Sequence, residues 1–418
     1  MANVARLVAV ARCVMSVLVL GVPVWTVRAM ANDVVLPNGV QLTQQGDLLN
    51  DTWHNTEQNT AQAAAQGVQQ NIKQETFLNN GVNTIPSDSD GIQDKTASKP
   101  NNQLNNQPSN DLENNPVAQY QLGMSYYQGT HDLNNASPNY PKALEWLQKA
   151  GEQGLAQAQF GLGVMYHRGQ GVPRDYAKAL AYYTQAANQG NVDAQYNLAL
   201  LYYGGQGTTQ DYSAAFTWLQ RASEQGLAVA QFHLGRMYVR GQGVSQDDVK
   251  ALAYYTKAAE QGLVVAELTV GQMYARGQGA VQDYSVAFTW LQRASKQGDV
   301  QAQYLLGVMY ANGQGVPRDY DKAVAHYTKA AEQGLAQAQF NLGTMYHQGR
   351  FISQDYTKAI TYYTKAAEQG LAQAQFNLGL MYYYAEGVKA DYSVAKAWFA
   401  KACDNGLLQA CENYQTLR

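Results

Sequence analysis

Apolar residues recur along most of this chain at helical spacing, and the pattern returns every 36 residues. In the copy that begins at Ala302, the residues Leu306, Met309 and Tyr310 complete one apolar stripe. Tyr304 falls on another face of the same predicted helix, and most other copies carry Tyr or Phe there. A helix that is apolar on two sides is expected to pack between neighbours on both sides.

The residues that follow predict a turn and a second helix. Gly313-Gln314-Gly315-Val316-Pro317 ends the first helix, and Asp319 is placed to cap the second. Gly307 is expected to let two helix backbones approach closely, and Gly334 to end the second helix. The predicted buried face of the second helix is Tyr320, Ala323, Val324, Tyr327, Ala330 and Ala331. The repeating unit is therefore a hairpin of two helices, each of about 12–15 residues.

Some copies carry their own local signals. Asn191 and Asp299 follow the glycine that ends the preceding hairpin, so each is expected to cap the next first helix. Phe351 and Ala385 replace turn glycines in the last two full copies. We expect their turns to differ in shape from the others.

The copies form one uninterrupted array. An early copy at Ala118 has four extra residues near 130–141, and a ninth begins at Ala410 and stops with the chain. The intervening copies begin at Ala158, Ala194, Ala230, Ala266, Ala302, Ala338 and Ala374. A fixed period held over eight units predicts an all-α solenoid in which each repeat packs mainly on its neighbours. Residues 118–409 are assigned to eight repeats, and residues 410–418 to a terminal capping helix.

The motif A-x-x-x-L-G-x-M-Y-x-x-G-x-G-V-x-x-D-Y-x-K-A-x-x-Y-Y-x-K-A-A-E-Q-G resembles the Sel-one-like repeat, a relative of the tetratricopeptide repeat. The period of 36 and the Gly-x-Gly turn favour this branch over the usual tetratricopeptide period of about 34. The resemblance covers about 70% of the chain, from Ala118 onward. It implies an adaptor or scaffold for other proteins, and it does not specify the partner.

The first 31 residues have the pattern of a secretory signal. Arg6 and Arg12 precede an uncharged, mostly apolar run at 13–27, and Ala29-Met30-Ala31 forms a cleavage site. The mature chain is therefore predicted to begin at Asn32 and to be periplasmic or secreted. The alternative is an uncleaved membrane anchor, although the apolar run is shorter than the roughly 20 residues of a typical span. No other segment is long and apolar enough to cross a membrane.

Residues 32–117 are rich in Asn, Gln, Ser and Asp. Few apolar side chains are available to offset the entropy of ordering, so this segment is predicted to be disordered. It holds ten acidic residues and three lysines, a net charge of −7, whereas residues 118–418 hold 23 basic and 22 acidic residues. Neither value favours binding to nucleic acid.

Cys403 and Cys411 fall near the end of a predicted second helix and in the helix after it. In an oxidising compartment this spacing indicates a disulfide between the two helices. Cysteine-rich members of the family have similar pairs. Metal binding and two free thiols are the alternatives.

No catalytic constellation stands out, and the sequence implies no cofactor. The six histidines are scattered, and none has a second histidine four residues away. Ser393-Val394-Ala395-Lys396 matches the S-x-x-K motif of β-lactam-binding enzymes, but S-D-N and K-T-G are missing. We interpret the match as a coincidence. An envelope enzyme that acts on cell-wall material or β-lactams is kept as the alternative function.

What remains is a surface on the first helices, which line the concave side in related hairpin stacks. Positions four, seven and eleven of each repeat lie on one flank, and none of these 24 places holds Asp or Glu. The candidate partner-binding residues on this flank are Arg168, His233, Arg236, Arg240, Arg276, Asn312 and Gln348. Gln272 shares it. The arginines favour an acidic peptide or protein ligand, and the alternative is an ordinary solvated face. The sequence thus predicts an exported scaffold whose oligomeric state stays open.

Overall fold

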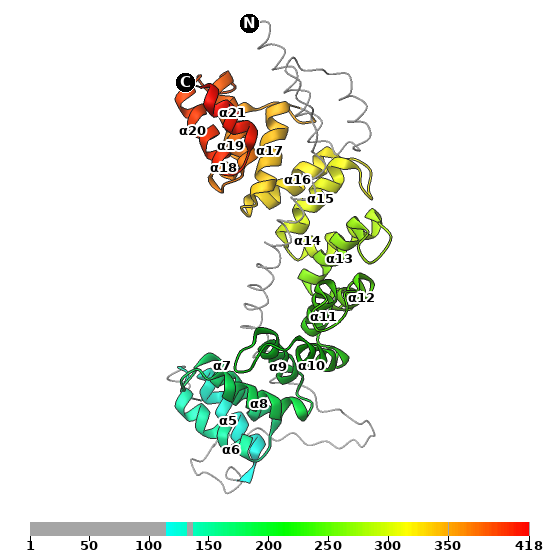
Figure 1. Cartoon of the computed structure of the whole chain (residues 1–418), viewed down its shortest axis with the longest axis vertical. Helices are drawn as coiled ribbons and strands as arrows, with labels where there is room; N and C mark the ends of the chain where they lie inside the picture. Colours follow the sequence, from blue (N-terminus) through cyan, green and yellow to red (C-terminus); the bar gives the residue numbers. More distant parts are fainter. Residues whose placement is uncertain (1–113, 132–136, 350, 418) are drawn as a thin grey trace, which may run out of the picture. The chain divides into compact units, whose positions relative to one another are not determined.

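A computed structural model of the protein describes residues 114–131, 137–349 and 351–417. All regular secondary structure in these ranges is helical, and successive helices form hairpins (Figure 1). The first helices are α5 (Pro116–Gln128), α7 (Ala156–Arg168), α9 (Val192–Gly204), α11 (Ala228–Arg240), α13 (Val264–Arg276), α15 (Val300–Asn312), α17 (Ala336–Gln348) and α19 (Ala372–Tyr384). The second helices are α6 (Tyr140–Glu152), α8 (Tyr176–Asn188), α10 (Tyr212–Glu224), α12 (Asp248–Glu260), α14 (Tyr284–Lys296), α16 (Tyr320–Glu332), α18 (Tyr356–Glu368) and α20 (Tyr392–Asp404). The predicted all-α array of hairpins is confirmed.

The described helices belong to two compact units, residues 114–258 and residues 259–417, with the boundary inside α12. Within each unit, consecutive helices pack against one another. This is the nearest-neighbour packing of a repeat array. The predicted signal segment, residues 1–31, and all but the last few residues of the acidic segment 32–117 lie outside the described residues.

The helix caps follow the sequence prediction. Asp319 Oδ1 accepts a hydrogen bond from the backbone N–H of Lys322 at 3.0 Å, and an aspartate caps most other second helices in the same way. Asn191 and Asp299 cap α9 and α15 as expected. Such caps satisfy backbone donors that have no partner within the helix.

The core of each hairpin is built from the predicted stripe. Ala302, Leu306 and Met309 are buried. Tyr304 packs both against the core cluster that α15 shares with the preceding hairpin and against the cluster that α16 shares with α17, which confirms the prediction of a helix between two neighbours. Gly307 allows the close approach, since a Cβ there would lie 2.6 Å from Cδ1 of Tyr327.

Buried glutamines, which the sequence analysis did not single out, form hydrogen bonds within a hairpin and between successive hairpins. The second residue of most repeats, such as Gln303 or Gln339, is a buried glutamine on the first helix. Gln303 Oε1 accepts a hydrogen bond from Gln333 Nε2 at 2.8 Å. Gln339 Nε2 donates to the carbonyl oxygen of Ala331, eight residues earlier, at 3.1 Å. These bonds make the burial of the amide groups tolerable.

Phe351 and Ala385 keep the left-handed conformation of the glycines that they replace, so the expected difference in shape does not arise at these two residues. Both residues have positive φ, 77° and 61°. At the equivalent Gly315, a Cβ would lie 2.3 Å from the carbonyl oxygen of Tyr284. Phe351 meets this crowding by stacking its ring on Tyr320, with centroids 3.4 Å apart. Nearest-neighbour packing therefore imposes the turn even where glycine is missing.

The array ends in a short helix, α21 (Leu408–Thr416), which packs on α20. Cys403 and Cys411 form the predicted disulfide between these helices, with Cα atoms 4.7 Å apart. By the 36-residue period, Glu412 stands where α19 has Phe376, and Gln415 stands where α19 has Gly379. Compared with α19, α21 therefore has a polar residue in place of the aromatic residue and a larger residue in place of the glycine. Both positions are ones against which a further second helix would pack.

Candidate binding surface

The predicted residues at position eleven, Arg168, Arg240, Arg276, Asn312 and Gln348, each form the last residue of a first helix. A glycine in the left-handed conformation follows every one of them. Arg168 and Arg240 are exposed, and the other three are half-buried. A cation at this end also stabilises the helix through its dipole, so the arginines have a structural role as well.

Arg168 already has a partner within the fold. It hydrogen-bonds the hydroxyl of Tyr127 in α5, which in turn donates to Gln170 Oε1 at 2.5 Å. Burial raises the pKa of Tyr127, and the charge of Arg168 opposes that shift. Part of the arginine's hydrogen-bonding capacity is therefore used to join adjacent hairpins.

His233 and Arg236 lie together on α11. His233 Nε2 is 3.2 Å from the hydroxyl of Tyr196 in the previous first helix, and the two rings meet edge to face. Burial, and then the nearby Arg236 charge, lower the pKa of His233 to about 3. The imidazole is consequently neutral near pH 7. It forms part of the polar floor of the surface, not a second cation on it.

Besides Arg168, Arg236 and Arg240 are the charged groups of this surface in the unit formed by residues 114–258. Arg236 is half-buried, Arg240 is exposed, and they are one helical turn apart. None of the ion pairs among the described residues involves either of them. We call His233, Arg236 and Arg240 the α11 cluster.

The remaining predicted residues belong to the unit formed by residues 259–417. Arg276 is at the end of α13, and Gln272 lies one turn before it. Gln272 is only 6% exposed, and its Nε2 has no hydrogen-bond partner among the described residues. Asn312 Nδ2 donates to Gln314 Oε1 at 3.4 Å, so this amide helps to close its own turn. The continuous arginine wall from Arg240 to Arg276 stays a prediction, because these residues belong to different units.

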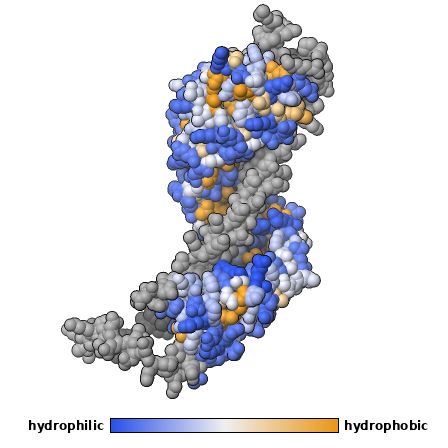
Figure 2. All heavy atoms as spheres, turned by 90° about the vertical axis from the view of Figure 1, so that its left-hand side faces the viewer, coloured by the Kyte–Doolittle hydropathy of each residue, from blue (hydrophilic) through white to orange (hydrophobic). Residues whose placement is uncertain are grey.

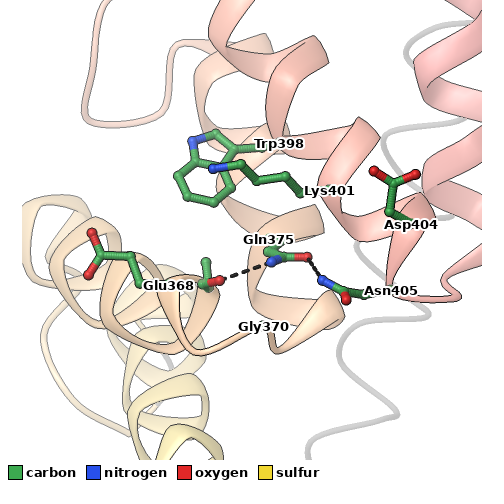
Figure 3. Close-up of a pocket in the computed structure, with 8 residues that line it drawn as sticks. Glu368, Gly370, Gln375, Trp398, Lys401, Asp404 and Asn405 are labelled. Atoms are coloured by element: carbon green, nitrogen blue, oxygen red, sulfur yellow. Dashed lines mark hydrogen bonds between the residues drawn. The ribbon is translucent and has the colours of Figure 1, made fainter.

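Two cavities that the sequence did not predict occupy equivalent places in two hairpins. One, of about 390 Å³, is bounded by α6, α7 and α8, and its lining includes Glu152, Gln159, Tyr182 and Gln185. The other, of about 460 Å³, lies 216 residues, or six repeats, further along the chain. Its lining includes the equivalent residues Glu368, Gln375, Trp398 and Lys401 (Figure 3). The recurring A-A-E-Q-G motif and the aromatic residue of the second helix were the available signals.

The second cavity shows how the fold builds this place. Gln375 Nε2 donates to the carbonyl oxygen of Ala367 and its Oε1 accepts from Asn405 Nδ2, both at 2.9 Å. Lys401 lies along the indole of Trp398, with Nζ 4.1 Å from the ring centroid (Figure 3). The aromatic face is thus covered by a cation from the same helix.

The structure gives no support to chemistry at Ser393-Val394-Ala395-Lys396. The Ser393 hydroxyl donates to Oδ1 of its capping Asp391 at 2.6 Å. Lys396 Nζ lies over the ring of Tyr414, 5.3 Å from its centroid. No group of three or more His, Cys, Asp or Glu side chains suited to a metal ion occurs among the described residues. Among those same residues, no helix is long and apolar enough to span a membrane.

The face of the molecule in Figure 2 is mostly hydrophilic, with apolar residues in small scattered groups. Stacked helical hairpins that repeat along the chain define a repeat protein of the α-solenoid class. The Sel1 repeat model matches residues 116–155, 156–191, 192–227, 228–263, 265–299, 300–335, 336–371 and 372–407. The chain belongs to the Sel1 repeat family, whose members typically serve as protein-interaction scaffolds.

Solved structures agree with this assignment. A protective antigen present in uropathogenic Escherichia coli strains, which displays an SLR fold, is 36% identical to this chain, with a TM-score of 0.68. The match covers 72% of this chain and 64% of the Escherichia coli protein, so the chain spans less than two thirds of that relative. A Sel1 repeat protein from Oxalobacter formigenes is 31% identical, with a TM-score of 0.60 and coverage of 74% and 88%. A comparison with curated proteins found no match.

Proposed function

We propose that this protein is an exported scaffold that binds a carboxylate-bearing segment of a partner protein along its first helices, on the concave face of the solenoid. The observation that carries the proposal is the α11 cluster. Arg236 and Arg240 lie on one flank of one helix, and neither is in an ion pair with a described residue. The guanidinium group offers a planar fork of donors that matches a carboxylate. Neutral His233 and the Tyr196 hydroxyl lie beside them, 3.2 Å apart.

Export is the second part of the proposal, and it rests on the N-terminal sequence pattern of residues 1–31. The Escherichia coli relative is described as a protective antigen, and export of this chain is in keeping with that description. The acidic segment 32–117, with its net charge of −7, is a competitor for the arginines within the same chain. It is a candidate internal cover for the binding surface.

The test measures binding of a hexaglutamate peptide, with hexaglutamine as the neutral control. An Arg236→Ala, Arg240→Ala variant should bind hexaglutamate at least about tenfold more weakly, since each partly desolvated charged hydrogen bond contributes about 1.5–3 kcal/mol. The matched control is Arg174→Ala, Arg221→Ala, which removes the same charge from the same unit. Both of these residues lie against aromatic rings, away from the α11 cluster in sequence. Equal weakening in the two variants would reduce the effect to net charge and contradict the proposal.

The same measurement on protein lacking residues 32–113 separates the two parts of the proposal. Tighter hexaglutamate binding after this deletion would identify the acidic segment as a competitor. Unchanged binding, with the arginine effect intact, would remove the internal cover and leave the binding surface in place.

A further inference from the structure

The cavity bounded by α6, α7 and α8 lacks a feature that most hairpins have. In most second helices, a Lys or Arg lies over the aromatic ring three residues earlier. These pairs are Lys149 over Trp146, Arg221 over Trp218, Lys257 over Tyr254, Arg293 over Trp290, Lys365 over Tyr362 and Lys401 over Trp398. In α8 the aromatic residue is Tyr182, and the cation is replaced by Gln185. No cation lies over Tyr182 among the described residues.

One side of the Tyr182 ring is occupied by the fold. It stacks on Tyr166 of α7, with centroids 5.7 Å apart and planes inclined by 10°. The matching pair in a later hairpin, Tyr238 and Tyr254, stacks in nearly the same way, and Lys257 still reaches Tyr254. The stacking therefore leaves room for a cation, and in α8 that room is part of the cavity of about 390 Å³.

The chemistry of the lining suits a positive charge. Glu152, the last residue of α6, is exposed and has no ion-pair partner among the described residues. It lies close enough to Tyr182 to help raise the pKa of that phenol, after burial and Tyr166. An acidic residue at the C-terminal end of a helix also lies at the negative end of the helix dipole. A cation here would therefore interact favourably both with the Glu152 carboxylate and with the end of α6.

The rim offers polar groups for more than a lone ion. Gln148 and Gln185 line the cavity, and neither amide makes a hydrogen bond to the described residues. Gln159 in the floor is already engaged by Gly151 and Gln189. Amide donors and acceptors beside an aromatic ring and a carboxylate match a basic side chain together with its own backbone.

We propose that this cavity binds an arginine or lysine side chain of a partner polypeptide, with its cation over Tyr182 and beside Glu152. The partner would supply the cation that most other second helices supply from their own sequence. The site lies between the second helices α6 and α8 and the first helix α7, and its charge is opposite to that of the α11 cluster, so it stands independently of the first proposed surface.

The experiment uses the full chain with methyl-labelled leucine, because Leu162 lines the cavity and reports on its occupancy. The probe is the peptide N-acetyl-Gly-Arg-Gly-amide, followed by nuclear magnetic resonance. The Leu162 signals should shift saturably. The citrulline analogue, which is neutral and of nearly the same shape, should bind about tenfold more weakly. Equal binding of the two peptides, or no saturable shift at Leu162, would overturn the proposal.

Variants locate the site. Gln185→Lys supplies the missing cation from within α8 and should abolish the shift, and Glu152→Gln should weaken binding about tenfold. Ala177→Lys is the matched control, since it adds the same charge two turns earlier on α8 at an exposed position. It should leave binding nearly unchanged. Loss of binding in Ala177→Lys equal to that in Gln185→Lys would contradict a local site. Choline is titrated in parallel, and tighter binding of choline than of the peptide would overturn the assignment to a polypeptide.

Discussion

At the scale of single residues, the environment of His233 departs most from what its residue type suggests. From the sequence alone, His233 beside Arg236 and Arg240 suggests a third positive charge on this helix. In the fold, burial and Arg236 lower its pKa to about 3, and Tyr196 meets it at 3.2 Å. The repeats contain a neutral counterpart, because Asn197, Asn341 and Asn377 occupy the same place in other copies.

This environment predicts a specific dependence of stability on pH. The unfolded chain binds a proton at His233 below about pH 6.5, whereas the folded chain resists protonation until about pH 3. The free energy of unfolding should therefore fall as the pH is lowered through this window. His233→Asn should lose less stability than the wild type between pH 7.5 and about pH 4.5. Thermal melts of both proteins at each pH provide the measurement, and parallel losses would show that His233 does not titrate this way.

Single residues also mark the limit of prediction from sequence. Asp319 and Asn191 were identifiable as caps because their role depends only on a few neighbours in the chain. The buried glutamines were not, because an amide is tolerated in the core only when a partner 30 residues away reaches it. The arginines at position eleven were identified from the sequence. The sequence pattern does not distinguish their role at the end of a helix from a role in binding, because both predict a basic residue at this position.

At the scale of the helical hairpin, one contact sets how closely the two helices pack. Gly307 faces Tyr327, and a Cβ there would lie 2.6 Å from the ring. The hairpin of α9 and α10 solves the same contact differently, with Ala199 in the first helix and Leu219 in the second, both in one core cluster. The residue at the glycine position thus depends on the size of its partner across the hairpin.

We therefore expect Gly307→Ala to destabilise the protein by about 1–3 kcal/mol, because the flat ring of Tyr327 cannot move out of a packed core. Adding Tyr327→Leu should recover part of the loss, since it recreates the Ala–Leu pair of α9 and α10. Gly271→Ala is the matched control, because Gly271 faces Leu291 and not an aromatic ring. Chemical denaturation of the wild type, of Gly307→Ala and Tyr327→Leu alone, and of the double variant gives the coupling energy. Independent, additive effects would show that this contact does not set the hairpin geometry.

At the scale of the whole molecule, the period of the sequence predicted the architecture well because each repeat packs on the next within each unit. The period also predicted which faces are buried. The two cavities were harder to foresee. Each needs three helices from two repeats. The exchange that removes the cation, Gln185 for Lys401, looks like ordinary surface variation in the sequence.

The same packing predicts that the array does not depend on the N-terminal segment for its stability. Protein lacking residues 1–113 should keep its helical circular dichroism and its melting temperature, because each described hairpin finds its core in adjacent hairpins. A large drop in melting temperature would show that part of the acidic segment belongs to the folded array. The full-length mature protein, produced in parallel, is the reference.

The polar substitutions in α21 have a consequence for where the gene can gain further repeats by duplication. A duplicated block of 36 residues inserted before Leu408 meets the same packing surface on both sides, because neighbouring copies already share it. A block placed directly after α21 would instead meet Glu412 and Gln415 where an aromatic residue and a glycine are needed. Lengthening by unequal crossing-over is thus confined to the interior. A reporter or an unrelated domain placed after α21 would therefore leave the stack at its present length, with Cys403 and Cys411 holding α21 on α20.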